Sequence, residues 1–315
     1  MNKFSIVIHG GAGTILRKDM TPELETAYLA GLKEALNAGY EILKDGGSSL
    51  DAVEIAVVAM ENNILFNAGR GSVFNNNGTH EMDAAIMDGK SLGAGAVAGV
   101  QLVPNPVTLA KLVMKNSEHV LLSGQGAKDF ALSQGVSLVQ DEYFFSQLRY
   151  DQWQVLMGTD NYALDHNSNS AIRINKEKKF GTVGAVACDQ YGNLAAATST
   201  GGMTNKKYGR IGDSPLIGCG TYANNQTCAI SCTGHGEPFI KAVAAYDVSC
   251  LMEYKGMNLQ QAMNEVVHLK LIQLQGEGGM IGVDSYGNAA MVFNSEGMYR
   301  GIMNSEGQME LAIYK

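Results

Sequence analysis

Several features are scarce in this chain of 315 residues, and each scarcity excludes a class of protein. No apolar run approaches the ~20 residues that span a membrane, so no transmembrane helix is expected. Lys and Arg number 23 against 31 Asp and Glu, which gives a formal net charge of −8 without any basic block. Nucleic acid and anionic membrane surfaces are therefore not expected as partners.

The amino-terminal segment lacks the pattern of a targeting signal. Its apolar stretch Phe4-Ser5-Ile6-Val7-Ile8 is shorter than the core of a signal peptide and runs directly into His9 and glycines. We interpret it as a buried strand and expect a cytoplasmic protein.

Cysteine is sparse, with five residues that all lie in the second half and show no Cys-x-x-Cys spacing. This predicts free thiols rather than disulfides or a metal site. Cys228 and Cys232 have the same parity on a predicted strand, so they should face one core. The six histidines show no His-Glu-x-x-His or similar spacing, which argues against zinc.

Glycine, by contrast, is abundant: 38 residues exceed the average share of roughly 7% and imply many tight backbone positions. Hydrophobic residues make up 45% and charged residues 17% of the chain, which is typical of a folded protein with a sizeable core. The length fits one large layered domain or two moderate ones.

Helix signals dominate the first half. Thr21 as N-cap and Pro22 at the first helical position predict a helix that ends at 45–47, and Ser48 can cap a second helix. A glycine-rich strand is expected within 93–103. Further helices are expected to begin near Pro106, Gln125 and Phe144.

The middle of the chain, from about 157 to 181, shows little periodicity and predicts a mobile connector. Two hairpins with the same Asp-x-Tyr-Gly-Asn turn follow it, at 189–193 and 284–288. Between them, helices are expected at 237–254 and 258–273. Strands that bracket helix pairs in both halves predict two sheets between helical layers.

Two glycine motifs resemble known binding or catalytic segments, but each lacks features that such a segment needs. The segment 84–91 matches a relaxed phosphate-loop pattern, but Ala84 stands where glycine is wanted, Asp88 would place a negative charge among the phosphates, and no helix can start after Ser91. A nucleotide-binding protein is kept as an unfavoured alternative. The segment 9–13 is similar to an oxyanion segment of serine esterases, but the chain contains no Gly-x-Ser-x-Gly.

Threonines and glycines remain as candidates for chemistry. A bare threonine hydroxyl is a poor nucleophile because it holds its proton, and it needs an adjacent base. If the Gly181-Thr182 bond were cut, the new α-amino group, with a reference pKa of about 8, would lie beside the hydroxyl. Taken alone, Thr182 also fits an ordinary strand start, and His9 fits a hydrogen-bonded side chain at a strand end.

Six segments occur in an order that identifies a family resemblance. They are 9–13 (HGGAG), 65–71 (LFNAGRG), 81–84 (EMDA), 181–187 (GTVGAVA), 198–202 (TSTGG) and 209–215 (GRIGDSP). Together they closely resemble the plant-type asparaginase/isoaspartyl peptidase family of N-terminal-nucleophile hydrolases, from residue 4 to about residue 300.

The resemblance implies an α+β fold, a four-layer αββα sandwich in one domain spanning 1–315. It implies a precursor that cleaves itself before Thr182 into an α subunit, 1–181, and a β subunit, 182–315. Thr182 would be the nucleophile in self-cleavage and in turnover, through a covalent β-aspartyl ester. The family assembles as a dimer of αβ heterodimers.

The resemblance also assigns roles to the remaining site residues. Thr200 would form a hydrogen bond close to the hydroxyl and amine of the nucleophile. Thr233 and Gly234 would form the oxyanion hole. Asn67 would help to order the residues around the nucleophile. Three more residues would bind the amino-acid head group of the substrate. Arg210 would bind its α-carboxylate, and Asp213 with the Gly236 carbonyl would bind its α-ammonium group. The planar guanidinium of arginine can donate two parallel hydrogen bonds to a carboxylate, and the negative aspartate pairs with an ammonium group.

Two further features follow from the resemblance. A structural sodium ion would be held by backbone carbonyls of the loop after the second helix, those of Met60, Glu61, Asn63, Phe66, Ala68 and Arg70. His235, which stands where family members differ, is a candidate for tuning substrate preference rather than for proton transfer.

The sequence thus predicts a hydrolase of β-aspartyl dipeptides and L-asparagine that needs no organic cofactor. The rival hypothesis is an uncleaved precursor that binds an amino acid but lacks a catalytic base. An intact-mass measurement after incubation separates the two.

Overall fold

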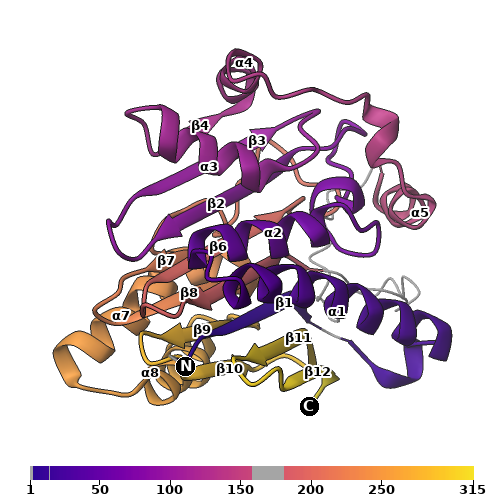
Figure 1. The fold of residues 1–315 in the computed structure, drawn as a ribbon. Coiled ribbons are helices and arrows are strands. Elements are labelled where there is room, and N and C mark those ends of the chain that lie inside the picture. Colours follow the sequence, from indigo (N-terminus) through magenta and orange to yellow (C-terminus); the bar gives the residue numbers. More distant parts are fainter. Residues whose placement is uncertain (1–2, 14, 158–180) are drawn as a thin grey trace.

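The computed structural model describes residues 3–13, 15–157 and 181–315 (Figure 1). Most of the predicted connector therefore lies outside the described residues. The helices are α1 Pro22–Lys44, α2 Ser49–Glu61, α3 Pro106–Asn116, α4 Gly124–Ser133, α5 Gln147–Leu156, α6 Gly236–Ala242, α7 Ala244–Lys255, α8 Leu259–Glu265 and α9 Leu271–Gln273. The strands are β1 Ser5–Gly13, β2 Met82–Asp88, β3 Ala94–Val100, β4 Leu121–Ser123, β5 Val183–Cys188, β6 Leu194–Thr200, β7 Thr221–Ala223, β8 Cys228–Gly234, β9 Gly278–Asp284, β10 Ala289–Phe293, β11 Gly297–Asn304 and β12 Met309–Tyr314.

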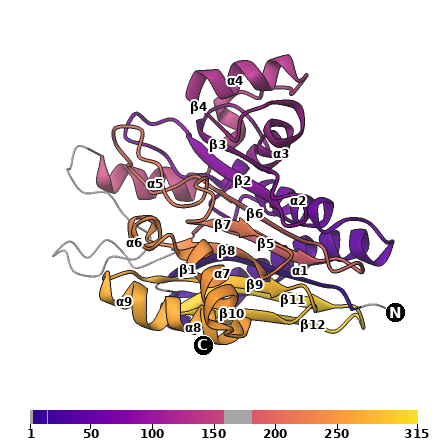
Figure 2. The ribbon, with the colours of Figure 1, turned by 90° about the vertical axis from the view of Figure 1, so that its left-hand side faces the viewer.

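The strands form two sheets packed face to face. The larger has the order β12-β11-β1-β5-β6-β2-β3-β4 and the smaller the order β10-β9-β8-β7. Helices α1, α2 and α3 cover the outer face of the larger sheet, while α7 and α8 cover the smaller one (Figure 1 and Figure 2). This arrangement confirms the predicted four-layer αββα sandwich.

Capping side chains set where the first two helices begin, as the sequence predicts. Thr21 Oγ1 accepts a hydrogen bond from the N–H of Leu24 at 3.3 Å, and Ser48 Oγ accepts one from the N–H of Asp51 at 3.1 Å. Each cap satisfies a donor at the helix start that has no partner within the helix, which is worth about 1 kcal/mol.

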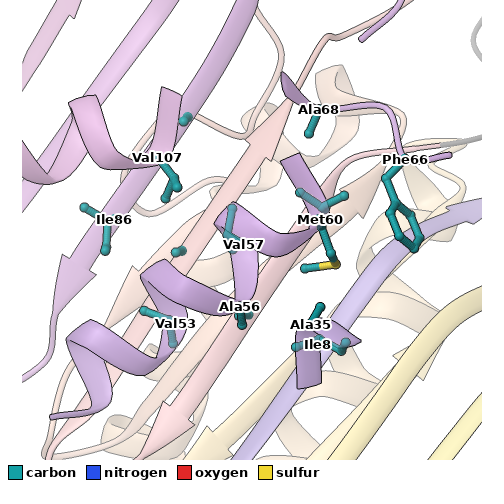
Figure 3. Close-up of a cluster of buried hydrophobic side chains, with 14 of the residues drawn as sticks. Ile8, Ala35, Val53, Ala56, Val57, Met60, Phe66, Ala68, Ile86 and Val107 are labelled. Atoms are coloured by element: carbon teal, nitrogen blue, oxygen red, sulfur yellow. The ribbon is translucent and has the colours of Figure 1, made fainter. Parts of the chain in front are cut away.

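Apolar side chains fill the three spaces between the four layers. Val53, Val57 and Met60 of α2 pack toward the larger sheet, where Ile8 and Ile86 lie (Figure 3). A second cluster fills the space between the sheets, and a third lies between the smaller sheet and its helices. Full burial of one such aliphatic side chain contributes roughly 1.5–3 kcal/mol, so these layers hold the two sheets at a fixed spacing.

The repeated turn motif builds two alike hairpins. The backbone N–H of Tyr191 donates to Asp189 Oδ1, and that of Tyr286 donates to Asp284 Oδ1, both at 2.9 Å. The aspartate side chain therefore closes each turn on its own backbone, which confirms the predicted β5–β6 and β9–β10 hairpins.

The segment 84–91 forms the end of β2 and the turn toward β3. No helix follows it, as the sequence predicts, so the nucleotide-binding alternative loses its structural basis. Three helix predictions differ from the structure. The helix expected at 237–254 is broken at Val243, whose φ of 49° is left-handed. The helix expected at 258–273 contains a π-helical turn at Val266–Lys270. The helix expected near Phe144 begins instead at Gln147.

Membrane-spanning helices, disulfides and metal-binding clusters were sought in residues 3–13, 15–157 and 181–315. None of the helices there is long and apolar enough to cross a membrane. All five cysteines are free thiols, and Cys228 and Cys232 face one core between β8 and the helices, as predicted. The same ranges contain no cluster of three or more His, Cys, Asp or Glu side chains that could hold a metal ion.

Candidate active site

Thr182 lies immediately before β5 and is 8% exposed, facing the space between the sheets. Its hydroxyl donates a hydrogen bond to Thr200 Oγ1 at 3.1 Å. Thr200 ends β6 and stands opposite the buried Asp83 of β2 in the strand register. Three polar side chains on neighbouring strands thus gather at one end of the inter-sheet space.

Thr233 approaches the same point from the other sheet. Its Oγ1 accepts a hydrogen bond from the N–H of Ala12 at 3.1 Å. A Cβ built on Gly181 would lie 3.2 Å from that oxygen, so the glycine of the predicted cleavage site lies beside the Thr233 hydroxyl. Since Thr233 accepts from Ala12, its own proton remains available for donation to a further acceptor.

Gly11 allows the close approach of the cleavage site to β1. Its φ is +117°, and a Cβ there would lie 2.6 Å from the nitrogen of Gly181. Any larger residue would displace Gly181. The two glycines therefore let the backbone just before the predicted cleavage point pack tightly against the strand.

Asn67 reaches Thr182 indirectly. Its Nδ2 donates to Gly202 O at 2.8 Å, and its Oδ1 accepts from the N–H of Val73 at 3.0 Å. Gly202 in turn donates its N–H to Thr200 Oγ1 at 2.9 Å. Asn67 therefore holds the turn after β6, and the turn orients the hydroxyl that accepts from Thr182.

The three residues predicted to read a head group lie together. A Cβ built on Gly236 would lie 2.9 Å from Asp213 Oδ1 and 2.9 Å from Arg210 Nη2. Burial raises the pKa of Asp213 to about 7, although the nearby Arg210 lowers it. Within the part of the chain that the structure describes, Asp213 Oδ2 is buried without a hydrogen-bond partner. A cationic ligand would satisfy this oxygen.

Glu237 belongs to this group and was missed in the sequence. Arg210 donates to it through Nε at 3.0 Å and Nη2 at 2.9 Å, and His235 Nε2 lies 3.0 Å from Glu237 Oε2. The bond from His235 and the Arg210 guanidinium hold the pKa of Glu237 well below its usual range. Its position directly after Gly236, at the start of a predicted helix, was the available signal.

Backbone carbonyls at the end of α2 and in the loop after it lie close to two glycines of that loop. A Cβ on Gly69 would lie 2.5 Å from Glu61 O, and one on Gly71 would overlap Phe66 O and lie 2.7 Å from Ile64 O. Glu61 O and Phe66 O belong to the predicted sodium set, and a hard cation prefers such oxygen donors. These two carbonyls are of the kind that a sodium ion requires, and the ion itself stays a prediction.

The four-layer fold and the Thr182–Thr200 pair between its sheets fit the class of N-terminal-nucleophile hydrolases expected from the sequence. Sequence comparison identifies the family. The family model described as Asparaginase matches residues 2–313, so the chain belongs to the asparaginase family.

Relatives within that family are similar over almost the whole chain. An isoaspartyl peptidase of Salmonella typhimurium is 54% identical over 300 residues, which cover 95% of each chain. An isoaspartyl peptidase of Escherichia coli is 51% identical over 95% of this chain and 92% of its own. The human isoaspartyl peptidase/L-asparaginase is 41% identical over 93% of this chain and 91% of its own.

Proposed function

We propose that this protein is an autoproteolytic threonine hydrolase that cleaves β-aspartyl dipeptides and L-asparagine. The observation that carries the proposal is the placement of Gly181 between Gly11 and Thr233, next to a Thr182 hydroxyl already bonded to Thr200. The names of the relatives supply the substrate class.

Self-cleavage requires attack of Thr182 Oγ1 on the carbonyl carbon of Gly181. The hydroxyl proton passes to Thr200 Oγ1, which releases its own proton toward the Thr182 nitrogen, and Thr233 donates to the Gly181 oxygen that becomes negative. The carbon–nitrogen bond then breaks as the nitrogen takes up that proton, and Gly181 is left as an ester on Thr182. Water hydrolyses the ester and separates residues 1–181 from 182–315.

Turnover repeats this chemistry on a substrate. The freed α-amino group of Thr182, with a reference pKa of about 8, takes the hydroxyl proton. The oxygen attacks the side-chain carbonyl, ammonia or an amine leaves with a proton, and a β-aspartyl ester forms. Thr233 Oγ1 and the Gly234 N–H stabilise the oxyanion, and water releases aspartate.

Arg210, Asp213 and Gly236 would hold the head group of the substrate. Arg210 has five N–H donors, and Glu237 takes two of them. The remaining edge lies beside Gly236 and Gly212. It would bind the substrate carboxylate, while Asp213 would accept from the ammonium group. The pair Arg210–Glu237 fixes the plane of the guanidinium before substrate arrives.

The raised pKa of Asp213 predicts a pH dependence of binding. Below its pKa of about 7 the folded carboxyl is neutral and cannot pair with an ammonium group, so affinity for L-aspartate should rise from pH 6 to pH 8. Calorimetric titration of the processed protein measures this. Asp213→Asn should bind weakly throughout and lose the pH dependence; an unchanged dependence would exclude Asp213 as its source.

We also propose a structural sodium ion in the 60–70 loop, held by carbonyls that include those of Glu61 and Phe66. When bound, it would stiffen the segment that carries Asn67. Sodium chloride should then raise the Tm more than choline chloride at the same ionic strength, because the ion binds the folded state alone. Equal Tm values in both salts would contradict the site.

The remaining predictions need solution measurements. We propose a dimer of αβ heterodimers, which light scattering of the processed protein tests. The cytoplasmic location and the lack of an organic cofactor stay predictions. The uncleaved, catalytically silent precursor remains the rival, and it predicts one persistent chain.

A further inference from the structure

His9 on β1 is a buried side chain that the proposed mechanism does not use. It is fully buried between the sheets, and both ring nitrogens have partners. Nδ1 lies 3.0 Å from the carbonyl oxygen of Thr182, and Nε2 lies 2.9 Å from Ser231 Oγ. The imidazole therefore joins the backbone of the nucleophile to strand β8 of the other sheet.

The partners fix which nitrogen carries the proton. A carbonyl oxygen only accepts, so His9 Nδ1 must donate to Thr182 O. Burial lowers the pKa of His9 to about 3, against the opposing effect of this bond, so the ring is neutral at ordinary pH. Nε2 is then an acceptor, and Ser231 must donate to it.

Two further hydroxyls lie behind Ser231. Having donated to His9, Ser231 Oγ accepts from Thr198 Oγ1 at 2.7 Å, and Thr198 Oγ1 accepts from Thr221 Oγ1 at 2.7 Å. The Thr198 and Thr221 hydroxyls also lie 3.3 Å from Gly220 O and 3.0 Å from Ser214 O, so their protons are shared with these carbonyl acceptors. The direction is fixed for the link from Ser231 through His9 to Thr182 O, in which each bond polarises the next.

Gly184 leaves the space in which the His9 ring and the Ser231 hydroxyl meet. It is the direct partner of His9 in the β1–β5 register. A Cβ at this position would overlap both Ser231 Oγ and His9 Nε2. Strand β5, which follows Thr182, therefore carries glycine at the place where the His9 ring reaches the other sheet.

We propose that His9 is a positioning residue that holds the Thr182 carbonyl, so that the amino-terminal threonine keeps one orientation for attack after cleavage. Cleavage removes the covalent link on the amino side of Thr182, and rotation about its remaining backbone bonds must then be limited from the carbonyl side. Ser231 lies two residues before Thr233 on the same face of β8, so the same link keeps nucleophile and oxyanion donor in register. The inference rests on Thr182 being the nucleophile of the proposed function.

The test compares His9→Phe, His9→Asn and Ser231→Ala, with His119→Asn at an exposed histidine as control. Phenylalanine keeps the shape of the ring and removes the donor. The carboxamide nitrogen of asparagine can occupy the position of Nδ1. The cleaved fraction is measured by intact mass, and kcat and KM are measured per cleaved chain from pH 5 to pH 9.

His9→Phe should lower kcat by roughly 10²-fold, since small misplacement of a reacting group costs about that much, with KM within a few-fold of wild type. His9→Asn should recover most of that loss, Ser231→Ala should fall between them, and the shape of the pH profile should stay unchanged. If His9→Phe does not fold, Ser231→Ala and His9→Asn still test the link.

Three results would overturn the inference: wild-type kcat in His9→Phe, equal losses in His9→Asn and His9→Phe, or the loss of a pH limb in His9→Asn, which would make His9 an acid or base. Failure of the proposed function is seen separately, as activity that persists in Thr182→Ala.

Discussion

Thr182→Ala should remain a single chain of 315 residues and release no ammonia from L-asparagine above background. Removal of Oγ1 deletes both the atom that attacks Gly181 and the atom that carries the ester during turnover. The expected loss in kcat is about 10⁴-fold or more, the size seen when a nucleophile that acts with its base is removed. Intact mass and a coupled ammonia assay measure the two effects.

Thr26→Ala is a suitable control, because Thr26 is an exposed threonine on α1 whose hydroxyl donates to Pro22 O of its own helix. It should be cleaved into residues 1–181 and 182–315 and turn over like wild type. Ammonia release at an undiminished rate by Thr182→Ala would rule out the proposed chemistry. A wild-type protein that stays one uncleaved chain and turns over no substrate would instead favour the amino-acid-binding rival.

The layered fold was predictable because its signals are local. The caps at Thr21 and Ser48 and the Asp-x-Tyr-Gly-Asn turns act within a few residues, and each lies where the sequence predicts it. Val243 shows the limit of that reasoning. Periodicity around it is helical, yet its left-handed backbone ends one helix and starts another. The new helix start is held by hydrogen bonds from the N–H groups of Ala245 and Tyr246 to the carbonyls of Cys219 and Gly218, which no local pattern records.

The site was predictable only as a set of motifs. Arg210 and Asp213 were assigned to a head group by resemblance, and the structure brings them together at Gly236. Sequence motifs do not indicate that Glu237 accepts two hydrogen bonds from the Arg210 guanidinium. Nor do they indicate that His9 bonds to both Thr182 and Ser231. Such pairs join residues far apart in the sequence, and only the stacking of the two sheets sets their distances.

Thr233→Val should slow both self-cleavage and turnover by about 10²- to 10³-fold, the usual cost of one oxyanion donor. Valine keeps the shape of the side chain. It cannot accept from the N–H of Ala12, and it cannot donate to the oxyanion of the proposed mechanism. Because the hydroxyl strengthens its bond only as negative charge develops, the loss should fall on kcat, with KM within a few-fold of wild type. Single-turnover kinetics on cleaved protein measures it.

Thr233→Ser and Thr227→Val make this result specific. Serine restores the hydroxyl and should recover most of kcat, whereas valine at 227 removes another buried hydroxyl, the one bonded to Ser249, and should lower stability without changing kcat. The oxyanion role fails if Thr233→Val turns over like Thr227→Val. A loss confined to KM in Thr233→Val would place the hydroxyl in substrate binding instead, since a group that acts on ground state and transition state alike changes affinity and leaves the chemical step unaltered.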